Sequence, residues 1–139
     1  MSPGPVVVDA SALVAAVADA DLIGTRARER LRDCRRVAPF LVDAEVGSAL
    51  RSMVLRGEIG EKAAESARLL AERMVHRRHP HHGVLASRAW QLRQSVSFYD
   101  ALYVALAERL DCPLITADKR IARALPHNDQ IYVIASTRS

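Results

Sequence analysis

Residues 5–18 read PVVVDASALVAAVA, and this stretch decides the fold class. Three consecutive valines form a short apolar run of the kind found in buried strands, and the run stops at Asp9. The alanine, leucine and valine residues that follow favour a helix. We therefore expect a strand that leads directly into a helix.

The same alternation continues along the chain. Short apolar runs predict further strands at residues 37–40, 113–116 and 131–134. Apolar residues at helical spacing predict helices at about 22–35, 41–55, 61–76, 84–93, 98–110 and 118–125. Strands and helices in alternation predict an α/β fold in which helices cover both faces of a short parallel sheet. No internal repeat or linker interrupts the chain, so we expect one domain over residues 1–139.

Composition excludes several classes of protein. No apolar run approaches the ~20 residues that span a bilayer, and the first residues lack the basic start of an export signal. Cys34 and Cys112 lack the spacing of a metal site and are expected to be reduced thiols. These features predict a soluble, cytoplasmic protein.

The positive charge comes almost entirely from arginine. Of the 20 basic residues, all but Lys62 and Lys119 are arginines, and the net charge is +4. The planar guanidinium fork suits phosphate oxygens. Binding to nucleic acid is therefore permitted, although solvated helix faces rich in arginine would give the same composition.

Four acidic residues fall at matching places in the predicted scheme. Asp9 and Asp118 each follow a predicted strand, while Glu45 and Asp100 lie in the first turns of predicted helices. Ligands of open parallel sheets bind beyond the carboxyl ends of the strands, so all four side chains are expected to converge there. Each acid alone could be only a helix cap or a favourable charge at a helix N-terminus. Together they would repel one another strongly unless a cation lay between them.

The acid cluster predicts a site for Mg²⁺ or Mn²⁺. Carboxylates without neighbouring Cys or His suit these ions, whereas Zn²⁺ normally recruits nitrogen or sulfur. One or two such ions could activate a water molecule for phosphodiester hydrolysis. Ser11 and Thr116, each two residues from an acid, could hydrogen-bond a ligand carboxylate or a metal-bound water, or could only satisfy turn backbone. We assign all four acids to the catalytic and metal site, with Glu45 binding directly or through water.

Four segments resemble the motif blocks of the PIN-domain family, and specifically of its VapC-type toxins: VVVDASALV, LVDAEVGSALR, SFYDALYVALAERL and LITADKRIARAL. The resemblance covers essentially the whole chain. It implies a three-layer α/β/α fold, Mg²⁺ or Mn²⁺ dependence, cleavage of RNA, a homodimer and a cognate VapB-type antitoxin. By position, the family's acidic residues match Asp9, Glu45, Asp100 and Asp118. Thr116 matches the hydroxyl of the Thr-x-Asp pattern, and Asp43 has no firm counterpart.

Two other functions stay open on the residues alone. The first is an aspartate-using phosphotransfer domain, but a phosphatase usually has Asp-x-Asp after its first strand, and Ser11 stands where the second acid would be. A phosphoacceptor domain would need an adjacent acid pair near the first strand, which is not evident. The second is a catalytically silent binding module that keeps the acids only for structure.

Several further features have two interpretations each. The segment HRRHPHH at 76–82 could ligate a transition metal or contact phosphate, but Pro80 breaks regular spacing and favours a solvated loop. For Trp90, a place in the core or at a dimer interface is favoured over base stacking. The small residues at 63–74 predict ordinary core, or a groove for the antitoxin or a second copy. The arginines expected to position phosphates near the acids are Arg51, Arg93 and Arg120.

Overall fold

The computed structural model describes residues 4–135, which form five strands in a single sheet. The strands lie in the order β3-β2-β1-β4-β5, and every neighbouring pair is parallel. The strands are β1 (Pro5–Val8), β2 (Arg35–Pro39), β3 (Arg77–His79), β4 (Leu114–Thr116) and β5 (Ile131–Val133). Strand β1 lies in the middle between β2 and β4, and β3 and β5 form the two edges of the sheet.

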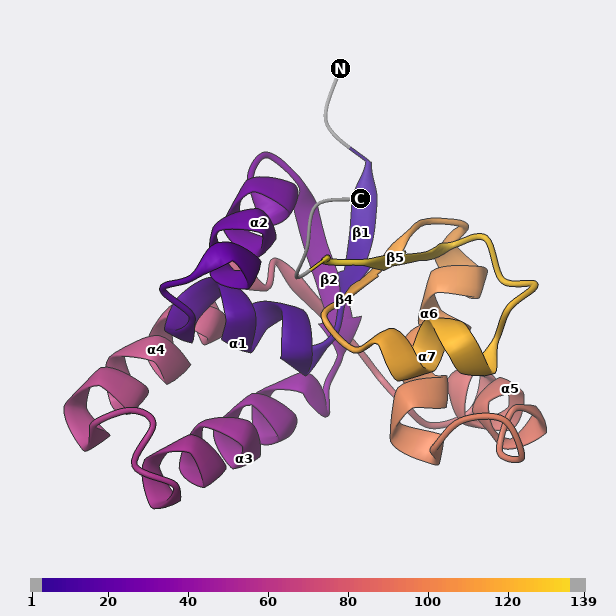
Figure 1. The fold of residues 1–139 in the computed structure, drawn as a ribbon. Helices are drawn as coiled ribbons and strands as arrows, with labels where there is room; N and C mark the ends of the chain where they lie inside the picture. Colours follow the sequence, from indigo (N-terminus) through magenta and orange to yellow (C-terminus); the bar gives the residue numbers. More distant parts are fainter. Residues whose placement is uncertain (1–3, 136–139) are drawn as a thin grey trace.

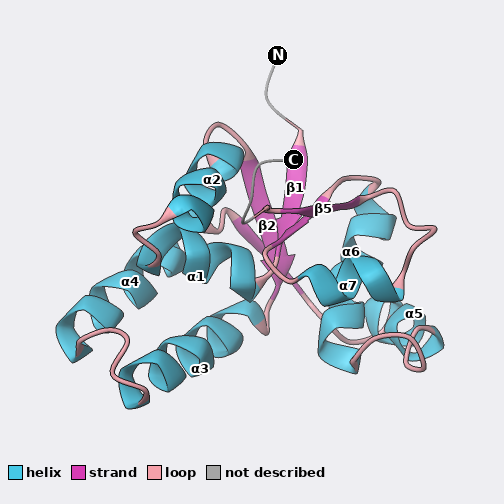
Figure 2. Cartoon of the chain, in the orientation of Figure 1, coloured by secondary structure: helices cyan, strands magenta, loops and turns pink. Residues whose placement is uncertain are grey.

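Helices cover both faces of this sheet. Within the described residues they are α1 (Ala10–Ala18), α2 (Leu22–Leu31), α3 (Val42–Leu55), α4 (Glu61–Met74), α5 (Val84–Gln91), α6 (Phe98–Leu110) and α7 (Lys119–Ala124). Figure 1 shows α1 to α4 on one side of the sheet and α5 to α7 on the other, and Figure 2 shows the strands between the two helical layers. The predicted three-layer α/β/α fold is confirmed.

The core lies on the central strands and on α6. Val7, Val8, Leu114 and Ile115 are fully buried, because β1 and β4 are covered on both faces. This explains why these strands have continuous apolar runs instead of an alternating pattern. In α6 every residue of Ala101–Ala107 is buried, so its N-terminal turn is held firmly beside the sheet.

One strand was missed in the sequence. The expectation of a solvated loop at residues 76–82 is wrong in its first half, where β3 pairs with β2 in the register Ala38↔Arg78. His76 also accepts a hydrogen bond at Nδ1 from the backbone N–H of Arg36, at 3.0 Å. A strand of only three polar residues shows no apolar pattern, and its pairing with β2 alone determines its conformation.

The expectations about two apolar surfaces have different outcomes. Trp90 is 59% exposed, so the predicted place in the core is wrong. In α4, Ala67 and Ala71 are buried, and the helix packs on α1 and α3. These alanines are therefore ordinary core and do not form an open groove.

The loops at the carboxyl ends of the strands determine where the acids lie. Each of the strands β1 to β4 is followed by a helix in one layer or the other, so the chain passes repeatedly over the same end of the sheet. In Figure 1 this end faces the space between α3 and the pair α6 and α7. No helix in the described part of the chain is long and apolar enough to cross a membrane.

Candidate active site

Asp9 lies at the point where β1 passes into α1. Its Oδ1 accepts hydrogen bonds from the Ser11 hydroxyl at 2.7 Å and from the Ala12 backbone N–H at 2.9 Å. Its Oδ2 accepts a hydrogen bond from the Thr116 hydroxyl at the end of β4. The side chain is an N-cap of α1, as the simpler interpretation proposed, but it is only 5% exposed and takes two further donors that a cap does not need.

Burial dominates the electrostatics of Asp9. Removal from water raises the pKa of this carboxyl to about 6, even though the hydrogen bonds from Thr116, Ser11 and Ala12 act to lower it. Repulsion from Asp100 raises the pKa further. Asp9 is therefore mostly ionised at neutral pH, although burial destabilises its negative charge. A nearby cation would offset this cost.

Ser11 and Thr116 form a hydroxyl pair around Asp9. Their oxygens lie 3.2 Å apart, and Thr116 is fully buried. The Ser11 hydroxyl also accepts from the Ala117 backbone N–H at 2.9 Å, and the Thr116 hydroxyl accepts from the Asp118 N–H at 3.0 Å. The two side chains thus bond both the carboxylate of Asp9 and the backbone of the turn after β4.

Asp118 caps α7 and is paired with a guanidinium group. Its Oδ1 accepts from the backbone N–H and the Nε of Arg120, both at 3.0 Å, and its Oδ2 accepts from Nη2 of the same residue at 2.9 Å. These hydrogen bonds hold the pKa of Asp118 below its ordinary value. The Arg120 side chain is 86% exposed. Arg120 is therefore at the acid cluster, as expected, and its side chain remains exposed to solvent while it binds Asp118.

Asp100 and Glu45 come from helices in opposite layers. Asp100 lies in the first turn of α6, where its backbone N–H is capped by the Ser97 hydroxyl at 3.1 Å. Glu45 lies in the first turn of α3 and accepts a hydrogen bond from the Tyr103 hydroxyl at 2.6 Å. Burial is the largest cause of a raised pKa at both carboxyls.

Tyr103 is a site residue that the sequence did not reveal. It is 1% exposed, and burial followed by its hydrogen bond to Glu45 raises its pKa. The negative charges of Glu45, Asp9 and Asp100 all act on its hydroxyl. The available signal was its place three residues after Asp100, which puts both side chains on one face of α6.

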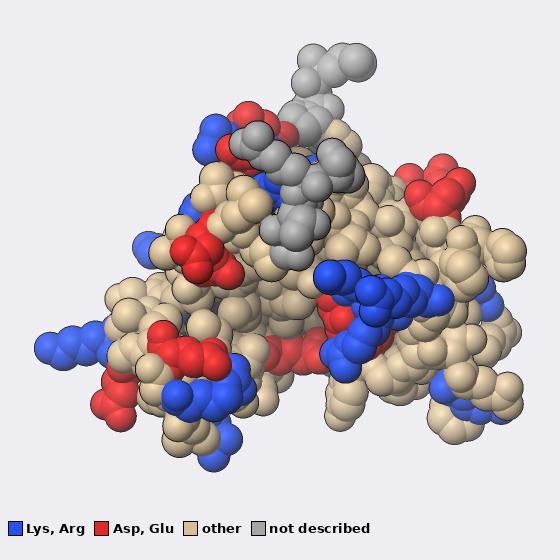
Figure 3. All heavy atoms as spheres, in the orientation of Figure 1, with Lys and Arg blue, Asp and Glu red and all other residues tan. Residues whose placement is uncertain are grey.

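Repulsion between the acids shows that they gather at one end of the sheet. Asp100 raises the pKa of both Asp9 and Glu45, and Asp118 raises that of Asp100. Asp100 is thus the neighbour of each of the other three carboxylates. Figure 3 shows acidic atoms in the hollow between the layer with α3 and the layer with α7, bordered by basic atoms on the α7 side.

The acids do not form a complete ligand set as they stand. Among residues 4–135, no three His, Cys, Asp or Glu side chains are placed to bind one metal ion. Arg120 holds both oxygens of Asp118, and Tyr103 holds one oxygen of Glu45. The donor chemistry, carboxylates alone, fits Mg²⁺ or Mn²⁺. The expectation of one shared cation site therefore requires side chains to reorient.

Other predicted contacts lie away from the acids. Asp43 binds Arg78 of β3, with Nη2 and Oδ1 2.8 Å apart, which agrees with its exclusion from the ligand set. The Arg93 guanidinium lies over the ring of Trp90, 4.6 Å from its centroid. Arg51 lines a pocket between α3 and α4. Of the three arginines expected near the acids, Arg120 is the one with a contact to them.

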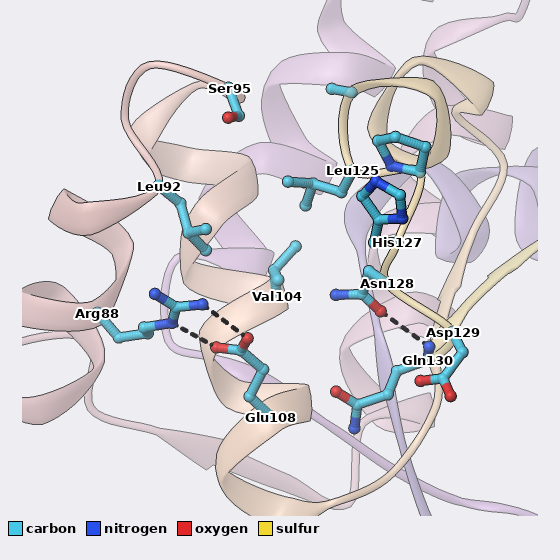
Figure 4. A pocket seen from close by; sticks show the side chains of 12 residues that line it. Arg88, Leu92, Ser95, Val104, Glu108, Leu125, His127, Asn128, Asp129 and Gln130 are labelled. Atoms are coloured by element: carbon cyan, nitrogen blue, oxygen red, sulfur yellow. Dashed lines mark hydrogen bonds and ion pairs between the residues drawn. The ribbon is translucent and has the colours of Figure 1, made fainter.

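A separate pocket of about 490 Å³ lies between α5, α6 and residues 124–130. Figure 4 shows the bidentate ion pair between Arg88 and Glu108 on one wall and Gln130 on another. None of the four acids lines it. Its Arg88–Glu108 pair is matched within the pocket, and His127 and Asp129 also line it.

The fold and the acids together define an α/β/α protein with a carboxylate cluster at the carboxyl ends of its strands, the usual position of sites in such sheets. Residues 6–125 match the family described as PIN domain. Ribonuclease VapC1 of Mycobacterium tuberculosis (strain ATCC 25618 / H37Rv) is 48% identical over 118 residues, covering 85% of this chain and 89% of the relative. Ribonuclease VapC9 of the same strain is 41% identical over 117 residues, covering 84% and 88%. The chain belongs to the PIN-domain family, and within it to the VapC-type toxins.

Solved structures agree in fold. PAE2754 from Pyrobaculum aerophilum superposes with a TM-score of 0.70 at 20% identity, covering 95% of this chain and 92% of that one. VapC20 of Mycobacterium tuberculosis, described as a Sarcin-Ricin loop cleaving toxin, superposes with a TM-score of 0.59 at 19% identity, covering 81% and 87%. At these identities the likeness concerns the architecture alone.

Proposed function

We propose that this protein is an endoribonuclease that depends on Mg²⁺ or Mn²⁺, and that it is the toxin of a toxin–antitoxin pair. The observation that carries the proposal is the buried carboxylate of Asp9 at the end of β1, with Asp100 close enough to raise its pKa. A charge placed in this way is costly to the fold, and a catalytic role explains its presence. The names of the VapC ribonucleases that resemble the chain support the same activity.

Asp9, Asp100, Asp118 and Glu45 would hold the metal ion. A bound divalent cation supplies positive charge that offsets the carboxylates, activates water and stabilises the negative charge that develops on a phosphodiester. The remaining residues position these groups. Ser11 and Thr116 fix the rotamer of Asp9, and Tyr103 fixes that of Glu45.

Arg120 would contact the substrate. Its guanidinium is exposed and lies beside Asp118. A guanidinium in this position can bind a phosphate group bidentately without reading the base. The chain itself therefore provides both the acids for the ion and a cation for the phosphate.

The sequence around Asp9 argues against the phosphotransfer alternative. Ser11 stands where a phosphatase would have its second acid, and its hydroxyl donates a hydrogen bond to Asp9 at 2.7 Å. A silent binding module remains distinguishable by experiment, since it would neither cleave RNA nor respond to divalent ions.

Two protein partners belong to this proposal, and we place the activity in the cytoplasm, where an RNA substrate is present. A groove of about 810 Å³ runs from Ser11 and Ala117 between α1, α2 and α3, with Val14, Ile23 and Met53 among its apolar lining residues. A VapB-type antitoxin segment in this groove would lie beside Asp9 and block the site. For a homodimer, the exposed Trp90 and Phe98, whose rings meet edge to face at 6.4 Å, offer an apolar surface.

The test is cleavage of RNA by purified protein with Mg²⁺ or Mn²⁺ present. Asp9→Asn should lower the rate by at least roughly 100-fold while leaving thermal unfolding cooperative. Asp129→Asn, at an exposed aspartate, is the matched control and should cleave like wild type. Equal rates for wild type and Asp9→Asn would refute the proposal, as would wild-type cleavage that is indifferent to EDTA.

A further inference from the structure

The sheet edge formed by β2 and β3 carries a second charged surface, separate from the acids. Neighbouring residues of a strand point to opposite faces of a sheet. On β2, Arg36 donates hydrogen bonds to the backbone carbonyls of Leu31 and Met74, the last residues of α2 and α4. Arg36 therefore points into the layer of α1 to α4, and Arg35 points to the opposite face.

The same reasoning applies to β3. Arg78 donates to the carboxylate of Asp43 on α3 and to the backbone carbonyl of Glu72 on α4. Arg78 thus points into the layer of α1 to α4. Arg77 and His79, its neighbours along the strand, point to the opposite face.

Arg35, Arg77 and His79 consequently share one face of the sheet edge, and Arg109 joins them from α6. The pKa of His79 is lowered, first by burial and then by the positive charges of Arg77, Arg35 and Arg109. Strand alternation places Arg35 and Arg77 on the same face as His79, and the charge of Arg109 reaches the imidazole from α6. We call these four residues the basic face.

The positive charge of the basic face is not compensated within the described chain. Arg35, Arg77 and Arg109 are exposed, and none of them forms an ion pair with a carboxylate among residues 4–135. No carboxylate is among the described groups that shift the pKa of His79. By contrast, Arg78 on the other face of β3 is paired with Asp43. Because α6 packs on β1, β2 and β4, the edge strand β3 lies beyond it. This surface therefore attracts anions.

We propose that the basic face binds backbone phosphates of the RNA substrate outside the active site and guides the strand toward Asp9. The inference rests on the proposed ribonuclease function. In the sheet order only β2 separates β3 from β1, so the strand ends at His79 and Asp9 are about 10 Å apart in the plane of the sheet. An RNA chain of a few nucleotides bound at Asp9 can therefore reach the basic face. Guanidinium groups bind phosphates without reading bases.

Protection of the sheet edge does not explain the whole cluster. Charged residues on edge strands prevent unwanted pairing with other chains, and this would account for Arg77. It does not account for Arg35, which lies on the inner strand β2, or for Arg109, which lies on a helix. A cluster drawn from three separate elements around one imidazole is better explained by a shared anionic ligand.

The test measures binding of a labelled single-stranded RNA of about 20 nucleotides, a length that exceeds typical single-strand site sizes. The protein carries Asp9→Asn, and the buffer contains EDTA, so that no cleavage occurs. The triple variant Arg35→Gln, Arg77→Gln and Arg109→Gln should raise Kd at least about tenfold near physiological salt. It should also reduce the slope of log Kd against log salt by about two, the value for three lost phosphate contacts to a single strand.

Lys62→Gln is the control, because it removes one exposed positive charge from the first turn of α4 in the opposite layer. It should change Kd by less than about twofold. A triple variant that behaves like this control would overturn the inference and leave an acidic protein surface as the alternative occupant. The proposed ribonuclease function is tested separately by cleavage. If that function is wrong, the protein with Asp9 intact will not cleave the same RNA with Mg²⁺ or Mn²⁺ present. Wild-type cleavage together with an unaffected triple variant would refute the basic face alone.

Discussion

Thr116 donates a hydrogen bond to Asp9 across a separation of 107 residues, and this contact joins the ends of the two central strands. Both side chains are buried. The hydroxyl stabilises the charged form of a carboxylate that burial otherwise destabilises. The contact therefore links the geometry of the sheet to the ionisation of the acid on which the proposed activity depends.

The ionisation of Asp9 should appear in the pH dependence of stability. Its pKa rises from 3.8 to about 6 on folding, so the folded state binds more protons than the unfolded state in this interval, and stability falls as the pH rises through it. The Asp9→Asn variant has no carboxyl group to ionise at this position, so its stability should not fall in this way. The difference in unfolding free energy between variant and wild type should therefore grow by up to about 3 kcal/mol from about pH 4 to about pH 7, measured by chemical unfolding in EDTA.

Asp129→Asn serves as the control for that series, because this aspartate is exposed. Its stability should run parallel to that of the wild type over the whole range. If Asp9→Asn also ran parallel, the buried charge would not be coupled to folding.

Divalent ions should stabilise the folded protein through the acid cluster. Mg²⁺ or Mn²⁺ at 100 times its Kd would add about 2.7 kcal/mol, measured as a rise in Tm relative to EDTA. Asp100→Asn should lose most of this rise, because Asp100 is the neighbour of the other three carboxylates. Identical melting of wild type in EDTA and in Mn²⁺ would contradict the assignment of these acids to a metal site.

Tyr103→Phe should leave Glu45 half-buried without its donor. Loss of a hydrogen bond to a charged group is expected to lower the free energy of unfolding by roughly 1–3 kcal/mol and to raise the pKa of Glu45 further. Urea unfolding measures the first effect, and the acid limb of the cleavage profile should move to higher pH. Tyr132→Phe, at a 48% exposed tyrosine on β5, is the control and should change neither quantity.

Arg120→Gln should have opposite effects on the metal and on the RNA. The variant frees Asp118 from its guanidinium partner, so Mn²⁺ should bind about two- to fivefold more tightly, as expected for loss of an exposed ion pair. The same change removes a phosphate contact, so KM for RNA should rise. Titration calorimetry and steady-state cleavage measure the two effects. Arg123→Gln on the same helix is the control. If Arg120→Gln bound Mn²⁺ more weakly and also had a higher KM for RNA, Arg120 would not compete with the metal for Asp118.

Gly24→Ala should destabilise the turn between α1 and α2. A Cβ at this position would lie 1.8 Å from the backbone oxygen of Asp19, so the helices would have to move apart. We expect a loss of roughly 1–3 kcal/mol, typical of overpacking. Gly47→Ala tests the reverse case inside α3, where a Cβ meets nothing within 4 Å and should stabilise by roughly 0.5–1 kcal/mol. Equal effects of the two substitutions would show that the close approach at Gly24 does not hold in solution.

Apart from β3, the sequence alone determined the strand–helix alternation, the capping positions and the end of the sheet where the acids gather. Asp9, Asp118 and Ser97 cap their helices through residues two or three positions away, and such contacts depend only on the local chain. Short apolar runs defined β1 and β4 because strands covered on both faces have no polar side. The placement of acids after parallel strands then followed from the topology of the fold.

Only the tertiary structure decided what surrounds each acid. Strand β3 forms because β2 lies beside it, and Tyr103 meets Glu45 because α6 and α3 pack from opposite layers. The orientation of Arg35 and Arg77 toward a shared face, and the burial that raises the pKa of Asp9, likewise depend on contacts between residues far apart in the chain. Side-chain packing across layers has no local signature, so the ionisation of the acids in the candidate site depends on the folded molecule and cannot be predicted from the motifs.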